Sequence, residues 1–270
     1  MLKILLILPA IIFPLLWIYA RVLERSRIFL PVKEITLTPD VLGLGYEDIY
    51  FTAEDKVKLN GWFISQPQAE YTVLFLHGNG GNISRRVEKA LFLHELGLNL
   101  FLVDYRGYGN SQGRPSEKGM YKDALAACRY LSENRAVHRD KIIVYGESLG
   151  GAAAIECACQ PGLAGLIVEG TFCRGIDLAR KAYPWIPAFF YSIKFDSCSA
   201  VKNLALPKLF FHSKNDEVVP FAQGSKLYQA APDPKTFVTT QGRHTAAFID
   251  DRETFRTALK KFISGLKDQD

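Results

Sequence analysis

The chain has 270 residues, of which 48% are hydrophobic, 23% charged and 12% aromatic. This composition excludes a disordered, low-complexity or collagen-like chain, and the length suits one large α/β domain. The net charge of +5 comes from basic residues that are scattered along the chain rather than gathered in a stripe, which argues against a nucleic-acid-binding protein.

An apolar segment opens the chain. Residues 2–20 carry one charge, Lys3, and a helix of this length would extend roughly 28 Å, close to the thickness of the hydrocarbon core of a bilayer. Ile18 at position −3 from Arg21 fits a signal-peptidase site poorly, so we expect an uncleaved single-pass membrane anchor. A cleaved signal peptide and an apolar arm packed on the domain are the alternatives. The balance of basic residues around the segment slightly favours a catalytic domain that faces the cytoplasm.

We interpret residues 21–45 as a connector. After them, short apolar runs alternate with amphipathic stretches. The first two runs predict an antiparallel pair, and the later runs, apolar throughout, indicate parallel strands covered on both faces by helices. Residues 46–270 are therefore expected to form one domain with a doubly wound, mostly parallel α/β sheet. The expected strands are 49–52, 57–64, 71–76, 98–103, 141–145, 163–168, 207–212 and 236–239, and the expected helices include 84–96, 118–133 and 252–266.

Residues 171–203 interrupt this alternation between two strands and are too long for an ordinary connection. They are rich in aromatic residues, and we expect them to form a short helical cap. Trp185, Phe189 and Phe190 are candidate contacts for an apolar substrate, the alternative being that they only pack on the domain.

Five cysteines are too few and too scattered for a disulfide scaffold. We interpret them as small buried apolar residues.

A G-x-S-x-G motif, Gly146-Glu147-Ser148-Leu149-Gly150, follows the expected strand 141–145 and precedes a run of small residues. A nucleophile on a sharp strand-to-helix turn needs this arrangement, because side chains two positions before and after the serine would collide. Ser148 is therefore the candidate nucleophile.

A serine nucleophile needs a histidine base and an acid that orients it, which follow the serine in the order acid, then histidine, in this type of fold. His244 lies in a turn-like stretch after the last expected strand, whereas His212 lies in an apolar run that favours a structural role. Asp216 is the candidate acid. Glu217 is an adjacent alternative, and Asp196 in the cap is a weaker one.

The oxyanion of the tetrahedral intermediate needs two backbone N–H donors. We predict Leu149, directly after the nucleophile, and Asn79, in the glycine-rich loop after strand 71–76. His77 precedes Ser148 and is interpreted as a brace of this loop rather than as the base.

The motifs at residues 76–82, 104–117, 146–151, 215–220 and 242–245 resemble those of the α/β-hydrolase superfamily, and the resemblance covers residues 45–267. Within it, the chain looks most like membrane-anchored α/β-hydrolase-domain proteins, which include depalmitoylases, and like bacterial serine-aminopeptidase-type hydrolases. The resemblance implies an α/β-hydrolase fold, a Ser-Asp-His triad, and a bracing role for the loop at residues 104–109. The short cap departs from the larger lids of lipases.

No dinucleotide-binding, phosphate-binding-loop or metal-ligand motif is present, so neither a cofactor nor a metal is expected. The predicted function is a serine hydrolase that cleaves an ester or thioester of a small molecule, a lipid or an acylated protein, with the bilayer as its partner. An aminopeptidase-type amide hydrolase and a non-catalytic membrane scaffold are the alternatives.

Overall fold

The computed structural model describes the backbone of residues 2–267 and their side chains, except those of residues 2–10, 24, 25 and 188. Within this range one sheet has the strand order β10-β9-β8-β7-β4-β6-β3-β2. β3 pairs antiparallel with both β2 and β6, and every other pair is parallel. The mostly parallel sheet with an antiparallel start is therefore confirmed. The strands are β2 (Glu47–Thr52), β3 (Lys58–Ile64), β4 (Thr72–Leu76), β6 (Asn99–Asp104), β7 (Ile142–Glu147), β8 (Gly165–Glu169), β9 (Lys208–Ser213) and β10 (Lys235–Thr240).

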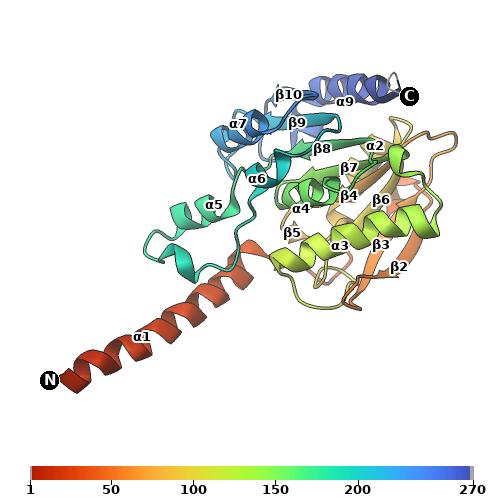
Figure 1. Ribbon diagram of the computed structural model, residues 1–270. Helices are drawn as coiled ribbons and strands as arrows, with labels where there is room; N and C mark the ends of the chain where they lie inside the picture. Colours follow the sequence, from red (N-terminus) through yellow and green to blue (C-terminus); the bar gives the residue numbers. More distant parts are fainter. Residues whose placement is uncertain (1, 268–270) are drawn as a thin grey trace.

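Helices cover both faces of this sheet, which is why the central strands are apolar throughout. One apolar core lies under α3 and α4, and Figure 1 shows these two helices side by side. A second core lies on the other face under α2 and α9, where the Phe211 and Phe255 ring centroids are 4.2 Å apart. The helices are α2 (Val87–His94), α3 (Glu117–Arg129), α4 (Leu149–Ala158), α7 (Phe221–Ala230), α8 (Ala247–Asp250) and α9 (Arg252–Lys267), with short helical turns η3 (Ile83–Arg86), η4 (Tyr130–Asn134) and η5 (Arg139–Lys141).

The insertion between β8 and β9 holds α5 (Gly175–Ala182), η6 (Ala188–Phe190) and α6 (Ser197–Val201). Its two ends meet at a backbone bridge between Arg174 and Asp196. Figure 1 shows the segment with α5 and η6 extending away from the sheet, towards the N-terminal helix.

The interpretation of all five cysteines as buried apolar residues is wrong for three of them. Cys173 and Cys198 form a disulfide, because the two ends of the insertion bring their Cα atoms to 4.8 Å. Cys159 is exposed, while Cys128 and Cys157 are free and buried as expected.

The N-terminal segment contacts both the cap and the domain. It consists of α1 (Leu2–Leu23), η1 (Glu24–Ile28), β1 (Leu30–Pro31) and η2 (Pro39–Leu42). The Phe13 and Phe190 ring centroids are 4.9 Å apart, and the Arg21 guanidinium donates to the Phe190 carbonyl. β1 pairs in parallel with β5 (Gly80–Gly81), and Phe29 is buried. The segment after α1 is therefore packed on the domain.

The predicted membrane anchor falls on α1, which Figure 1 shows projecting from the body of the protein. In the part of the chain that the structure describes, no helix combines the length and the apolarity needed to cross a membrane. The first half of the predicted anchor, residues 2–10, has side chains outside the described part.

Candidate active site

Ser148 lies at a sharp turn between β7 and α4. Its backbone has φ 54° and ψ −118°, a conformation that residues other than glycine rarely adopt and that costs on the order of 1–3 kcal/mol. A Cβ atom at Gly146 would lie 2.4 Å from the Gly151 Cα, and one at Gly150 would lie 2.1 Å from the Leu76 carbonyl oxygen. The two glycines of the motif are therefore required by close packing around the turn.

The next strand, β8, holds this turn in place. The Ser148 N–H donates to the Glu169 carbonyl oxygen at 2.7 Å, and the Thr171 hydroxyl donates to the Ser148 carbonyl oxygen at 2.9 Å. These bonds fix the serine backbone from the end of β8 and from the residues that follow it, which offsets part of the strain.

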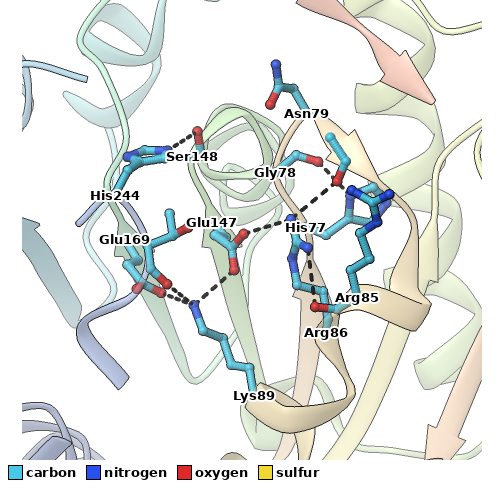
Figure 2. A network of polar contacts seen from close by, with 12 residues as sticks. His77, Gly78, Asn79, Arg85, Arg86, Lys89, Glu147, Ser148, Glu169 and His244 are labelled. Carbon is cyan, nitrogen blue, oxygen red and sulfur yellow. Dashed lines mark hydrogen bonds and ion pairs between the residues drawn. The ribbon is translucent and has the colours of Figure 1, made fainter. Parts of the chain in front are cut away.

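Ser148, His244 and Asp216 meet although they come from three separate loops at the carboxyl ends of β7, β10 and β9. The His244 Nε2 lies 2.9 Å from the Ser148 Oγ, and the His244 Nδ1 lies 2.7 Å from the Asp216 Oδ2. Figure 2 shows the imidazole facing the hydroxyl. The arrangement lets the histidine accept the serine proton through one nitrogen while it donates to the carboxylate through the other.

The side chain of Asp216 is buried, yet its surroundings favour the ionised form. Burial alone would raise the pKa of Asp216, but the hydrogen bond and charge of His244 and the backbone N–H groups of Val218 and Val219 hold it below its ordinary value. Those N–H groups donate to the Asp216 Oδ1 at 2.9 and 2.7 Å. The ionised carboxylate fixes the tautomer in which Nε2 faces the serine.

The weaker candidates make other contacts. His212 is buried, and its Nε2 lies 2.9 Å from the Val219 carbonyl oxygen and 3.4 Å from the Asp216 Oδ2, beyond the acid from Ser148 in this chain of contacts. The Asp196 carboxylate accepts from the Ser199 N–H at the start of α6. The Glu217 carboxylate accepts the His244 backbone N–H at 3.0 Å, so Glu217 supports the loop of the base rather than its ring.

The two predicted oxyanion donors lie beside the nucleophile. Leu149 is the first residue of α4, where backbone N–H groups have no acceptor within the helix. Asn79, Ser148 and Leu149 line the same cavity. A Cβ atom at Gly78 would lie 3.4 Å from the Ser148 Cβ, which shows how closely this loop approaches the serine. The assignment of both donors stays a prediction.

His77 and the loop after β6 hold the Asn79 loop in place. The His77 Nε2 lies 3.2 Å from the Asp104 Oδ1, at a fully buried position. The Tyr105 and Tyr108 hydroxyls donate to the carbonyl oxygens of His77 and Asn79 at 3.1 and 2.9 Å. This geometry agrees with the bracing roles expected for both segments.

A buried ion network under the site was missed at the sequence level. The Lys89 Nζ, on α2, donates to Glu147 at 2.9 Å, to Glu169 at 2.7 Å and to the Thr245 carbonyl oxygen at 3.2 Å. Arg86 adds a contact of 3.0 Å to Glu147, and Figure 2 shows these groups below Ser148 and His244. The network joins the residue before the nucleophile to the residue after the base. The signal in the sequence was a carboxylate at the end of each of two neighbouring buried strands.

The charges of this network stabilise one another. Burial alone would raise the pKa of Glu147, but the charges of Arg86 and Lys89 lower it to about 2. Burial alone would lower the pKa of Lys89, but the two carboxylates raise it above its ordinary value. Burial and the Glu147 charge raise the pKa of Glu169.

A cavity of about 560 Å³ opens over the nucleophile and is mostly apolar. Trp185 and Phe189 are not among its lining residues and are 63% and 69% exposed, while Phe190 is buried against Phe13. None of the three candidate contacts therefore lines the cavity. The cavity is lined instead by cap residues on either side of η6 and by the last residues of α1 and η1. These are Leu23, Ile28, Phe172, Leu178, Ala179, Tyr183, Tyr191, Ile193 and Phe195, among others. Arg27, Lys181 and Glu217 are its charged lining residues.

Within the described residues, no three His, Cys, Asp or Glu side chains are grouped to hold a metal ion.

Several known proteins are similar to this chain in sequence or in fold. A family model described as serine aminopeptidase, S33, matches residues 67–197. The α/β-hydrolase domain-containing protein WAV2 of Arabidopsis thaliana is 34% identical, over 89% of this chain and 87% of its own length. Protein bem46 of Schizosaccharomyces pombe is 36% identical, over 73% and 69%. The Pyrococcus furiosus esterase Pf2001 shares the fold, with a TM-score of 0.72 and 22% identity over 87% of this chain and 98% of that one. The chain therefore belongs to the α/β-hydrolase family and is a hydrolase of that type.

Proposed function

We propose that the protein is a serine esterase or thioesterase that works through an acyl-enzyme. The observation that carries this proposal is the pair of contacts from His244, 2.9 Å to the Ser148 Oγ and 2.7 Å to the Asp216 Oδ2. Ser148 attacks the carbonyl carbon while His244 takes its proton, and the oxyanion is held by the N–H groups of Asn79 and Leu149. His244 then protonates the leaving oxygen or sulfur, and water, deprotonated by His244, releases the acid.

The acyl cavity, as we name the space of about 560 Å³ over Ser148, supports an acyl chain as the group transferred to the serine. Its wall is made mainly of aliphatic and aromatic side chains, which favour burial of methylene groups, each contributing about 0.8 kcal/mol. An amide-cleaving aminopeptidase is the second candidate, because the matching family model carries that description. Such an enzyme would need a carboxylate to bind the substrate amine, and Glu217 is the acidic residue that lines the cavity.

The first test is covalent labelling followed by a comparison of substrates. A fluorophosphonate probe is expected to label the protein at Ser148, and p-nitrophenyl esters are expected to show kcat/KM values that rise with acyl length until the cavity is filled. Leu178→Trp, which adds bulk to the cavity wall, should move the optimum to shorter chains. Aminoacyl amides hydrolysed faster than every ester would favour the aminopeptidase, and a folded protein that takes up no probe would favour a non-catalytic scaffold.

We also propose that a lipid surface presents the substrate. Apolar side chains at residues 11–22 of α1 are exposed beside the cap, among them Ile11, Leu15 and Ile18 at 54%, 59% and 51%. Ile11, Leu15 and Ile18 are four and three residues apart, so they lie on one face of the helix, and α1 contacts the cap at η6.

Vesicle flotation tests this surface. The full chain is expected to float with phosphatidylcholine vesicles, and the triple variant Ile11→Glu, Leu15→Glu, Ile18→Glu should stay in the dense fractions because charged side chains do not enter the apolar region of lipid. Val41→Glu with Ile249→Glu, at apolar positions equally exposed but on the body of the domain, serves as the control. Equal flotation of all three proteins would contradict the proposal.

A further inference from the structure

A second cavity, of about 310 Å³, lies beside the triad and differs in character from the acyl cavity. Three arginines, Arg85, Arg86 and Arg243, line it together with His244, and we name it the arginine cavity. Glu217 lines both cavities, so the two meet at the triad. The volume is at the lower end of the range of small-molecule sites, roughly 300–1,000 Å³.

Two carboxylates, Glu147 and Glu217, also line the arginine cavity. Glu147 is bound by Arg86 at 3.0 Å and by Lys89 at 2.9 Å. Glu217 accepts the backbone N–H of His244 at 3.0 Å. Glu147 is therefore neutralised by its own cations, whereas Glu217 keeps its charge. The four cationic lining residues, Arg85, Arg86, Lys89 and Arg243, still outnumber the two carboxylates, so the cavity carries an excess of positive charge.

Two guanidinium groups remain for a ligand. Arg85 and Arg243 are exposed, and within the part of the chain that the structure describes no carboxylate lies within ion-pair distance of either. The two come from different loops, η3 and the turn after β10, yet both line this one cavity. Guanidinium groups bind planar or tetrahedral oxyanions through paired hydrogen bonds, which makes such a cavity suited to a phosphate or a carboxylate.

The wall that carries Arg85 depends on a glycine. A Cβ atom at Gly81, where φ is +85°, would lie 2.6 Å from the Arg85 Cδ. The aliphatic part of Arg85 therefore rests directly on the backbone of β5, next to the Asn79 loop. In Figure 2, His244 lies to the left of Ser148, and Arg85 and Arg86 lie to its right.

The direction of proton transfer places the leaving group at this cavity. His244 Nε2 must give its proton to the leaving atom, so the leaving group departs along the side of the imidazole. His244 lines the arginine cavity, whereas Ser148, Asn79 and Leu149 line the acyl cavity. The acyl and leaving parts of one substrate would thus occupy the two cavities.

We propose that the arginine cavity binds an anionic group, a phosphate, on the leaving part of the substrate. This inference rests on the proposed function. The substrate is then an acyl ester whose alcohol carries a phosphate. The bond between the carbonyl carbon and the ester oxygen breaks as the bond to the Ser148 Oγ forms, and the proton from the Ser148 hydroxyl passes through His244 to the alcohol oxygen. Water completes the cycle, so the products are a carboxylic acid and a phosphorylated alcohol.

Matched substrates test the inference. Monoacylglycerol and monoacylglycerol 3-phosphate with the same acyl chain differ only in the phosphate. The kcat/KM for hydrolysis of the acyl ester is expected to be at least tenfold higher for the phosphorylated substrate than for the neutral one. Butanoyl esters in solution and hexadecanoyl esters in mixed micelles separate the two sources of the anion. A preference in both arms indicates a phosphate recognised by itself, and a preference in the micelles alone indicates a lipid headgroup; both support the inference.

Variants connect the preference to the cavity. Arg85→Gln with Arg243→Gln should lower the ratio of the two kcat/KM values by about ten- to a hundredfold, since each arginine supplies charge-assisted hydrogen bonds. Arg114→Gln, at an exposed arginine outside both cavities, should leave the ratio unchanged. The inference is overturned if the ratio of the two kcat/KM values is near one in every arm, or if the double variant does not change it. In that case, hydrolysis of the neutral ester would still support the proposed function. Failure to hydrolyse any of the esters, with no labelling of Ser148, defeats both.

Discussion

Replacement of Ser148 by alanine, or of His244 by alanine, is expected to lower kcat for ester hydrolysis by about four to six orders of magnitude. The hydroxyl and the imidazole act as one unit, because the Oγ becomes nucleophilic only when the Nε2 at 2.9 Å accepts its proton. The double variant should therefore lose no more activity than either single variant. Steady-state kinetics with one p-nitrophenyl ester, after active-site titration of the wild-type enzyme, measures the effect.

Two further variants control for folding and for the role of the acid. Asp216→Asn should reduce kcat by roughly four orders of magnitude, because the amide favours the wrong tautomer of the imidazole. Ser148→Gly should be as inactive as Ser148→Ala but more stable by about 1 kcal/mol, because glycine adopts the φ of 54° without strain. If Ser148→Ala and His244→Ala both kept substantial activity while folded, the assignment of the triad would be wrong.

The second large effect is expected for Lys89→Met, which should lower the free energy of unfolding by about 3–5 kcal/mol. Lys89 is 2% exposed and bridges the carboxylates of Glu147 and Glu169. Methionine fills a similar volume but leaves the Glu169 carboxylate buried without its cation. Loss of the bond to the Thr245 carbonyl should also free the His244 loop and lower kcat. Urea unfolding and ester kinetics on the same samples measure both effects.

A rescue variant and a surface variant make this prediction specific. Lys89→Met with Glu169→Gln should recover part of the lost stability, because the second change removes the uncompensated charge. Lys122→Met, which breaks the exposed ion pair with Glu54, should leave the free energy of unfolding nearly unchanged. Similar losses for Lys89→Met and Lys122→Met would contradict a stabilising role for the buried network.

The sheet could be predicted from the sequence because its signals are local. The runs at residues 71–76 and 98–103 are apolar throughout, and strands of that kind become β4 and β6 when helices cover both faces. The turn at Ser148 was predictable for a similar reason. A Cβ atom at Gly150 or Gly146 would lie only 2.1 or 2.4 Å from neighbouring backbone, and this requirement for glycine is visible within five residues of sequence. The order of Ser148, Asp216 and His244 along the chain then left few partners to consider.

The remaining features depend on contacts between distant segments. Cys173 and Cys198 are 25 residues apart, and nothing near either one indicates a pair until the ends of the cap meet. Lys89 lies on an amphipathic helix, where a lysine is ordinarily solvated, and its two carboxylate partners lie 58 and 80 residues away. Trp185 and Phe189 were chosen for their aromatic character, but the direction of a side chain in an irregular cap depends on its backbone turns.

The end of α1 and the turn η1 also line the cavity over the nucleophile. Leu23, Arg27 and Ile28 are side by side with cap residues in the wall above the nucleophile, and β1 is fastened to the strand beside the Asn79 loop. A truncated chain that starts after residue 28, the natural choice for easier expression, would lack one side of the chamber that receives the acyl group. Substrate profiles measured on such a fragment would then describe a wider and more open enzyme than the 270-residue chain.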